Sequence, residues 1–191
     1  MTTLASEKTG GVGHPSFVGI LAARVPVVVP LGLYSVALFA NVLLTLPAMS
    51  QSSPQWVWHL GLAAGALFAV AVPFMLWAYF VVAIYVSLVL LGQDVRPSNL
   101  ARIISAAFLF AAAGKLIETA LVLAGRVEFA AWPYIVLAIG GLVVSGYGMH
   151  RDLDVPVEDA FLSSAIALFV LELLFHLLPL AMNVGAVVAP T

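Results

Sequence analysis

Five long apolar stretches, joined by short polar segments, constrain the fold of this chain more than any other feature. They cover residues 17–49, 56–91, 98–125, 131–149 and 157–188. A helix needs about 20 mostly apolar residues to cross a bilayer, and each stretch offers about that many or more. Charged residues make up only 8% of the chain and hydrophobic residues 63%, which leaves too few charges for a soluble surface. The sequence therefore predicts an all-α, polytopic membrane protein with a bundle of five transmembrane helices.

Prolines mark expected irregularities within these stretches. Pro26 and Pro30 lie near the start of the first stretch, so residues 17–24 are expected to lie along the membrane interface before the span begins. Pro73 lies near the middle of the second stretch and predicts either a kink or a division into two pieces. The polar, glycine-rich residues 1–15 are predicted to form a flexible tail. Residues 16–191 would then form a single transmembrane helical domain.

The basic residues predict the orientation of the chain, because cytoplasmic loops are enriched in lysine and arginine. With five spans, the side that holds the N-terminus carries five of them: Lys8, Arg24, Arg96, Arg102 and Arg151. The opposite side carries only Arg126, and Lys115 falls inside a span. We therefore expect a cytoplasmic N-terminus and an external C-terminus.

Four ionisable residues interrupt the apolar stretches. Lys115 and Glu118 lie in the third stretch, and Glu172 and His176 lie in the fifth. Both stretches would run outward, and at about 1.5 Å per residue the four side chains fall in one layer of the outer half of the membrane. An ionised group at mid-bilayer costs roughly 2.5–3.5 kcal/mol, so we expect Lys115 to pair with Glu172 and Glu118 with His176. Asn41 of the first stretch is a further candidate for this intramembrane polar layer.

The polar layer has several possible roles. It fits a structural clasp that fixes the register of two helices, and its residue types also suit a proton or ion relay. The weaker metal candidates are His59, Glu118 and His176, on ligand type alone. A haem site is disfavoured because no two helix histidines clearly share a depth. The chain has no cysteine, which excludes thiolate metal sites and cysteine-ligated clusters, and we expect no cofactor and no metal.

Small residues predict where helices approach one another. Gly61 and Gly65 form a GxxxG pattern, and Gly140 and Gly141 lie in the fourth stretch. Such glycines let helix backbones come close together, and packing within the bundle is favoured here over a dimer interface. The net charge of −2 is too small to indicate a nucleic-acid partner. No P-loop, GxSxG, HExxH or dinucleotide fingerprint occurs in a suitable context, so no catalytic residue is predicted.

Residues 60–180, and above all LLGQDVRPSNLARIISAAFLFAAAG and IGGLVVSGYGMHRDLDVPVEDAFLSSAIALFVLELL, resemble the Yip family of five-helix membrane proteins in hydropathy and spacing. Ala160 takes the position of the alanine that opens the fifth helix in that family. The third stretch differs, since AAFLFAAAGKLIET stands where a glycine–tyrosine and a proline are expected. The resemblance implies the same orientation as the charges do, and bacterial members look like membrane organisers or accessory proteins.

These observations predict a non-enzymatic integral membrane scaffold or accessory subunit of the bacterial inner membrane. Its expected partners are the lipid bilayer and other membrane-protein subunits, held through helix faces in a larger complex. One alternative is a small transporter or a proton- or ion-conducting protein that uses the polar layer. Another is a cofactor-binding membrane subunit of an electron-transfer complex.

Overall fold

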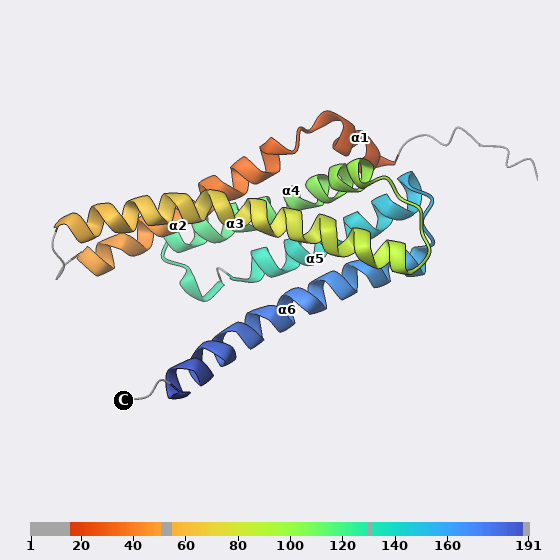
Figure 1. Ribbon diagram of the computed structural model, residues 1–191. Helices are drawn as coiled ribbons and strands as arrows, with labels where there is room; N and C mark the ends of the chain where they lie inside the picture. Colours follow the sequence, from red (N-terminus) through yellow and green to blue (C-terminus); the bar gives the residue numbers. More distant parts are fainter. Residues whose placement is uncertain (1–15, 51–54, 130, 189–191) are drawn as a thin grey trace, which may run out of the picture.

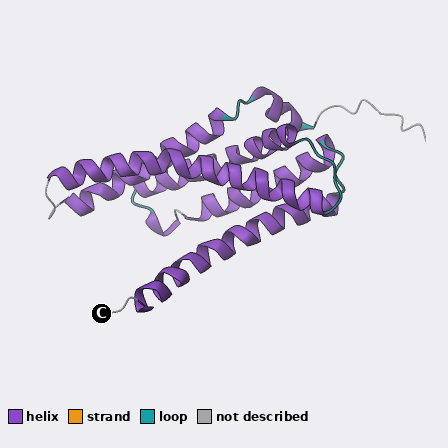
Figure 2. Ribbon diagram, viewed as in Figure 1, coloured by secondary structure: helices purple, strands orange, loops and turns teal. Residues whose placement is uncertain are grey.

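The computed structural model describes residues 16–50, 55–129 and 131–188, which are helical almost throughout and include no strand (Figures 1 and 2). The predicted flexible tail, residues 1–15, lies outside this described part. The helices are α1 (Phe17–Arg24), α2 (Val28–Ser50), α3 (Gln55–Leu90), α4 (Pro97–Leu123), the short 3₁₀ helix η1 (Val127–Phe129), α5 (Ala131–Asp152) and α6 (Val157–Val188). The all-α class is confirmed. Helices α2 to α6 begin and end close to the limits of the five apolar stretches, except that the first stretch is divided.

The division of the first stretch falls beside Pro26, where it was expected. Helix α1 ends at Arg24, and the axes of α1 and α2 differ in direction by 81°. Ser16 caps α1, because its Oγ accepts a hydrogen bond from the backbone N–H of Gly19 at 3.0 Å. The Ser16 N–H and hydroxyl donate to the two carboxylate oxygens of Asp152, at 3.1 and 2.5 Å. This contact fixes the start of α1 to the end of α5.

The second stretch forms one continuous helix of 36 residues, α3, with Pro73 buried inside it. Of the two expectations for this stretch, a single helix is therefore the correct one. The turn directly after α3 contains Gly92, whose φ of 79° lies in the left-handed region that favours glycine. The Gln93 N–H donates to the Leu88 carbonyl at 2.9 Å, which is the long hydrogen bond of a Schellman ending.

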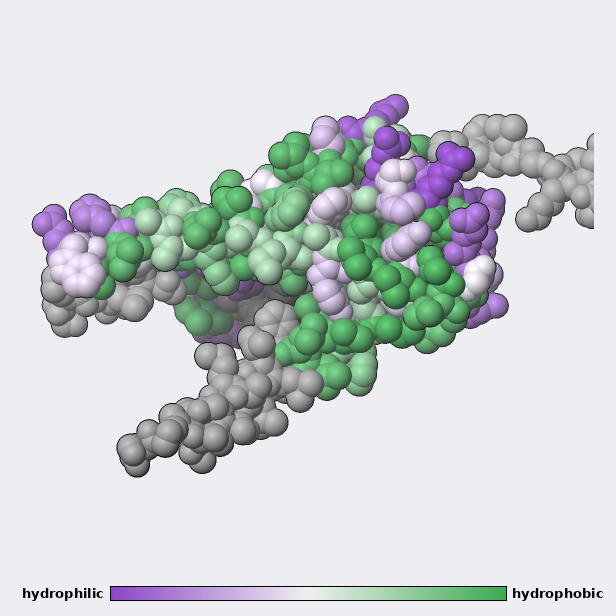
Figure 3. Space-filling model, in the orientation of Figure 1, coloured by the Kyte–Doolittle hydropathy of each residue, from purple (hydrophilic) through white to green (hydrophobic). Residues whose placement is uncertain are grey.

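Helix α4 lies at the centre of the bundle, in contact with α1, α2, α3 and α5, whereas α6 contacts α3 and α5. Figure 1 shows α6 diverging from α5 toward its C-terminal end. The core consists largely of aliphatic side chains near the α3–α4 and α5–α6 connections, including Ile84, Leu88, Leu100, Ile103 and Met149. Figure 3 shows hydrophobic residues over the sides of the helices and hydrophilic residues gathered at their ends. Such a surface is the reverse of what a soluble bundle presents.

Within the described part of the chain, α3 and α4 are each long and apolar enough to cross a membrane. The bent pair α1 and α2 makes a third candidate if the two helices form one span. The protein thus has two or three candidate membrane-spanning helices. The number of five spans and the orientation of the termini stay predictions.

Candidate functional site

An ion pair lies inside the bundle on α4. Lys115 Nζ and Glu118 Oε1 are 2.7 Å apart, and their side chains are only 17% and 19% exposed. The pair forms locally, because residues three apart on a helix lie on the same face. In a membrane helix, such a contact lets each charge offset much of the cost of the other.

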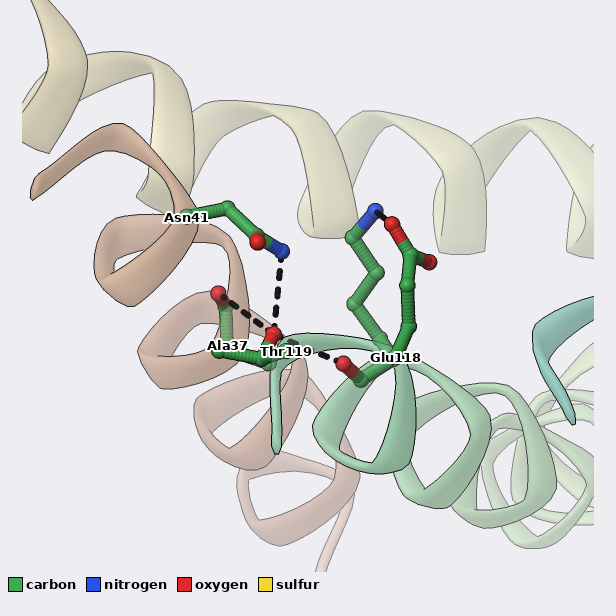
Figure 4. A network of polar contacts seen from close by, with 5 residues as sticks. Ala37, Asn41, Glu118 and Thr119 are labelled. Atoms are coloured by element: carbon green, nitrogen blue, oxygen red, sulfur yellow. Dashed lines mark hydrogen bonds and ion pairs between the residues drawn. The ribbon is translucent and has the colours of Figure 1, made fainter. Parts of the chain in front are cut away.

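A hydrogen-bonded link from α2 to α4 begins one residue further along (Figure 4). The Asn41 amide nitrogen donates to Thr119 Oγ1 at 2.9 Å, and the Thr119 hydroxyl donates to the Lys115 carbonyl at 2.8 Å. The Ala37 carbonyl, at 3.4 Å, is a more distant acceptor for the same single hydroxyl proton. Thr119 is 5% exposed. We call Asn41, Lys115, Glu118 and Thr119 the α2–α4 network.

The α2–α4 network contains three of the five residues that the sequence assigned to a polar layer. The ion pair shown for Lys115 joins it to Glu118 of its own helix, not across helices as the sequence suggested. Glu172 is exposed on α6, and α6 contacts α3 and α5. The His176 side chain lies outside those that the structure describes. The pairs of Lys115 with Glu172 and of Glu118 with His176 therefore stay predictions.

The described part of the chain holds no group of three His, Cys, Asp or Glu residues able to bind an ion. The set of His59, Glu118 and His176 is not tested by this, because the His176 side chain lies outside that part. His59 is exposed in the first two turns of α3, where its ring and the Trp58 ring form a T-shaped pair with centroids 5.5 Å apart. Glu118 is engaged with Lys115.

Two of the four glycines that the sequence singled out, Gly65 and Gly141, lie in close helix contacts. A Cβ added at Gly65 of α3 would collide with Val42 of α2, and one added at Gly141 of α5 would lie 2.9 Å from the Ala107 carbonyl oxygen of α4. A Cβ at Gly140 would meet only the Phe110 ring edge, at 4.0 Å. Gly61 lies one turn before Gly65 in α3. Gly65 and Gly141 thus occupy positions of close approach within one chain.

Two further polar contacts join helices and were not predicted. The Trp77 indole N–H of α3 donates to Ser105 Oγ of α4 at 2.9 Å, and the Tyr79 hydroxyl of α3 donates to the Ala167 carbonyl of α6 at 2.7 Å. The sequence did contain a signal for the Trp77 contact, because a tryptophan far from the ends of an apolar helix needs an acceptor for its indole N–H. The sequence could not show which neighbouring helix supplies that acceptor.

An apolar cavity of 150 Å³ lies among α2, α3, α4, α5 and α6. Its wall includes large side chains from α3 and α4, such as Phe80 and Phe108, and small residues where α4 faces α5, such as Ala111, Ala138 and Gly141. Ser145 also lines it, and the Ser145 hydroxyl donates to the Leu142 carbonyl of its own helix at 2.8 Å. The cavity therefore offers mainly hydrocarbon contacts.

The fold and the α2–α4 network define an all-helical protein with two or three candidate membrane spans and a polar link inside its bundle. No protein-family model, no curated protein and no solved structure matches the chain. The resemblance to the Yip family therefore stays a prediction.

Proposed function

We propose that this chain is a non-enzymatic integral membrane scaffold or accessory subunit that binds other membrane proteins through its helix faces. In the proposed arrangement it crosses the inner membrane of a bacterium five times, with the N-terminus in the cytoplasm and the C-terminus outside. The observation that carries the proposal is the exposed apolar face of α6 on which Glu172 lies. This acid is exposed on α6, among exposed apolar side chains such as Phe169 and Leu173.

A carboxylate on a lipid-facing helix surface is costly, since an acid near mid-bilayer costs roughly 2.5–3.5 kcal/mol on insertion scales. A neighbouring subunit that covers this face would shield the acid and the apolar side chains around it from lipid, in addition to any contact that Glu172 makes within its own chain. Ionisable residues inside membranes commonly mark functional contacts for this reason. The exposed face of α6 around Glu172 is thus the proposed binding surface for a partner helix.

The α2–α4 network supports a structural role more than a relay. Lys115 and Glu118 neutralise each other, and Asn41 and Thr119 hold α2 against α4. A relay needs groups that exchange protons along a path to both membrane surfaces. These four side chains instead form bonds that fix helix positions. The connections between α3 and α4 and between α5 and α6 are also short, which leaves little room for an active site outside the bundle.

Native gel electrophoresis of mildly solubilised membranes tests the proposal. The wild-type chain is expected in a complex larger than its own oligomer, and Glu172→Leu is expected to release it. Glu128→Leu is the matched control, because Glu128 is an exposed glutamate in η1, away from α6. A complex that survives Glu172→Leu, or that Glu128→Leu disrupts equally, would contradict the proposed surface.

A photo-crosslinking amino acid gives an independent reading in intact membranes. Placed at Phe169, which is 68% exposed on α6, it should yield a discrete protein adduct. Placed at Leu67, which is 72% exposed on α3, it should react with lipid. Protein adducts at neither position, or at both positions alike, would remove the support for α6 as the binding surface.

A further inference from the structure

The cavity among α2 to α6 lies in the middle turns of these helices, away from their hydrophilic ends. The contributing residues include Phe80 on α3, Phe108 on α4, Leu142 on α5 and Leu168 on α6. Its volume is 150 Å³, and an apolar cavity of about this size in a soluble protein stays dry and takes up benzene or xenon. The site therefore selects apolar matter and excludes water.

We propose that this cavity binds one acyl chain of a membrane phospholipid, as a specific site inside the bundle. The inference rests on the proposed topology, because it needs α5 and α6 to lie in the bilayer beside α3 and α4. A methylene group takes up about as much space as a water molecule, about 30 Å³, so the cavity holds a stretch of about five methylenes. A chain inserted end-first would fill it, with the headgroup left outside.

Two features select an acyl chain over other apolar ligands. The first is location: the cavity is partly open, and in a bilayer the material at such an opening is the hydrocarbon of lipids. The second is shape, since small residues face one another where α4 meets α5. The small side chains of Ala111 and Ala138 leave room there for a narrow chain.

The opening is expected between α5 and α6. Ala138 is the lining residue nearest the start of α5, and Leu171 is the one nearest the end of α6. Figure 1 shows the N-terminal part of α5 and the C-terminal part of α6 diverging. An acyl chain that enters sideways from the lipid at this point reaches the cavity from the side of α5 and α6, whereas the Lys115–Glu118 pair lies one to two turns beyond Ala111 on the same face of α4.

Photolabelling with a lipid tests the proposal on the full chain. The probe is a phosphatidylcholine that carries a diazirine midway along one acyl chain, in phosphatidylcholine vesicles with the reconstituted protein. Light expels dinitrogen, and the carbene inserts into a nearby C–H bond, so mass spectrometry of peptides locates the chain. Labelling is expected both at Leu142, in the cavity wall, and at Val143, which faces outward on the same helix.

Filling the cavity should remove one of these labels and keep the other. Ala111→Leu places a larger side chain in the cavity, so Leu142 labelling should fall to the level of an unirradiated sample while Val143 labelling persists. Ala113→Leu, at an exposed position two residues away on α4, should change neither. Ala138→Leu fills the same space from α5 and serves as a second variant if Ala111→Leu does not fold.

The outcomes separate this inference from the proposed function. Labelling of Val143 without Leu142 in the wild-type chain would overturn the acyl-chain site and leave the topology intact. Leu142 labelling that persists in folded Ala111→Leu or Ala138→Leu would also overturn it. Absence of label at both positions would place α5 outside the bilayer and overturn the topology together with this site. In a further arm, an unlabelled isoprenoid alcohol that displaces the probe better than unlabelled phosphatidylcholine would replace the proposed ligand by an isoprenoid.

Discussion

The ion pair on α4 allows a quantitative prediction of stability. Changing Glu118 to Leu removes the carboxylate 2.7 Å from the Lys115 ammonium and leaves that cation in a bundle where it is 17% exposed. Removing one partner of a fully buried pair costs about 3–5 kcal/mol. About a fifth of each side chain is exposed here, and the remaining group can reduce its cost by changing protonation. We therefore expect each single change, Glu118→Leu or Lys115→Leu, to cost about 2 kcal/mol.

The two single changes and the double change, Lys115→Leu with Glu118→Leu, form a double-mutant cycle with the wild-type chain. Replacing both groups by leucine leaves no charge behind, and such replacements are often near neutral, so we expect a cost of at most about 1 kcal/mol. Additive single changes would cost about 4 kcal/mol, which makes the expected coupling about 3 kcal/mol. The free energy of unfolding of all four purified proteins is measured in one detergent, with circular dichroism recorded as the denaturant concentration is raised. Additive effects would refute the pairing of these two side chains.

A second cycle tests the partner that the sequence suggested for the lysine. If Lys115→Leu and Glu172→Leu are also coupled, the carboxylate of α6 shares the cation, and the polar layer extends across helices as predicted. If that cycle is additive while the first is coupled, the ion pair is confined to α4. A double leucine variant at positions 115 and 118 that is stable but loses the native complex or a transport activity would favour a functional use of the charges over a clasp.

Three further outcomes follow from the described geometry. Asn41→Leu removes one hydrogen bond between α2 and α4 and should lower the free energy of unfolding in detergent by roughly 0.6–1.7 kcal/mol, from the average to the largest value found for such bonds in a membrane protein. No change in the free energy of unfolding would mean that this bond adds nothing. Gly141→Ala should destabilise the protein by roughly 1–3 kcal/mol, because its Cβ would lie 2.9 Å from a backbone oxygen of α4. Gly140→Ala should be neutral or stabilising in the same measurement, and similar effects of the two changes would contradict the packing of α5 on α4. In this cysteine-free chain, an impermeant thiol reagent added to intact cells should label Glu128→Cys but not Asp94→Cys, and the reverse pattern would invert the orientation.

The sequence predicted the helices well because the signal for them is local. Apolar stretches and prolines lie in the segments that they shape, so the break beside Pro26 and the limits of α3 to α6 were close to those observed. Polar partners depend on which helices are neighbours, and hydropathy does not show that. Asn41 was among the polar candidates and hydrogen-bonds Thr119, but Thr119 itself was missed, since threonine is common in apolar helices and binds its own backbone.

The length of α3 has a consequence for the bilayer around it. At about 1.5 Å per residue its 36 residues extend about 54 Å, against about 30 Å of hydrocarbon and about 40–45 Å with both headgroup regions. A tilt of about 35°, within the range of roughly 0–40° seen for membrane helices, shortens its projection to about 44 Å. Helix α3 then crosses obliquely from headgroup to headgroup, with Trp56 and Trp58 at one polar boundary. A thin membrane would leave apolar turns of α3 outside the hydrocarbon region, so hydrophobic mismatch should favour the location of this protein in thicker bilayers.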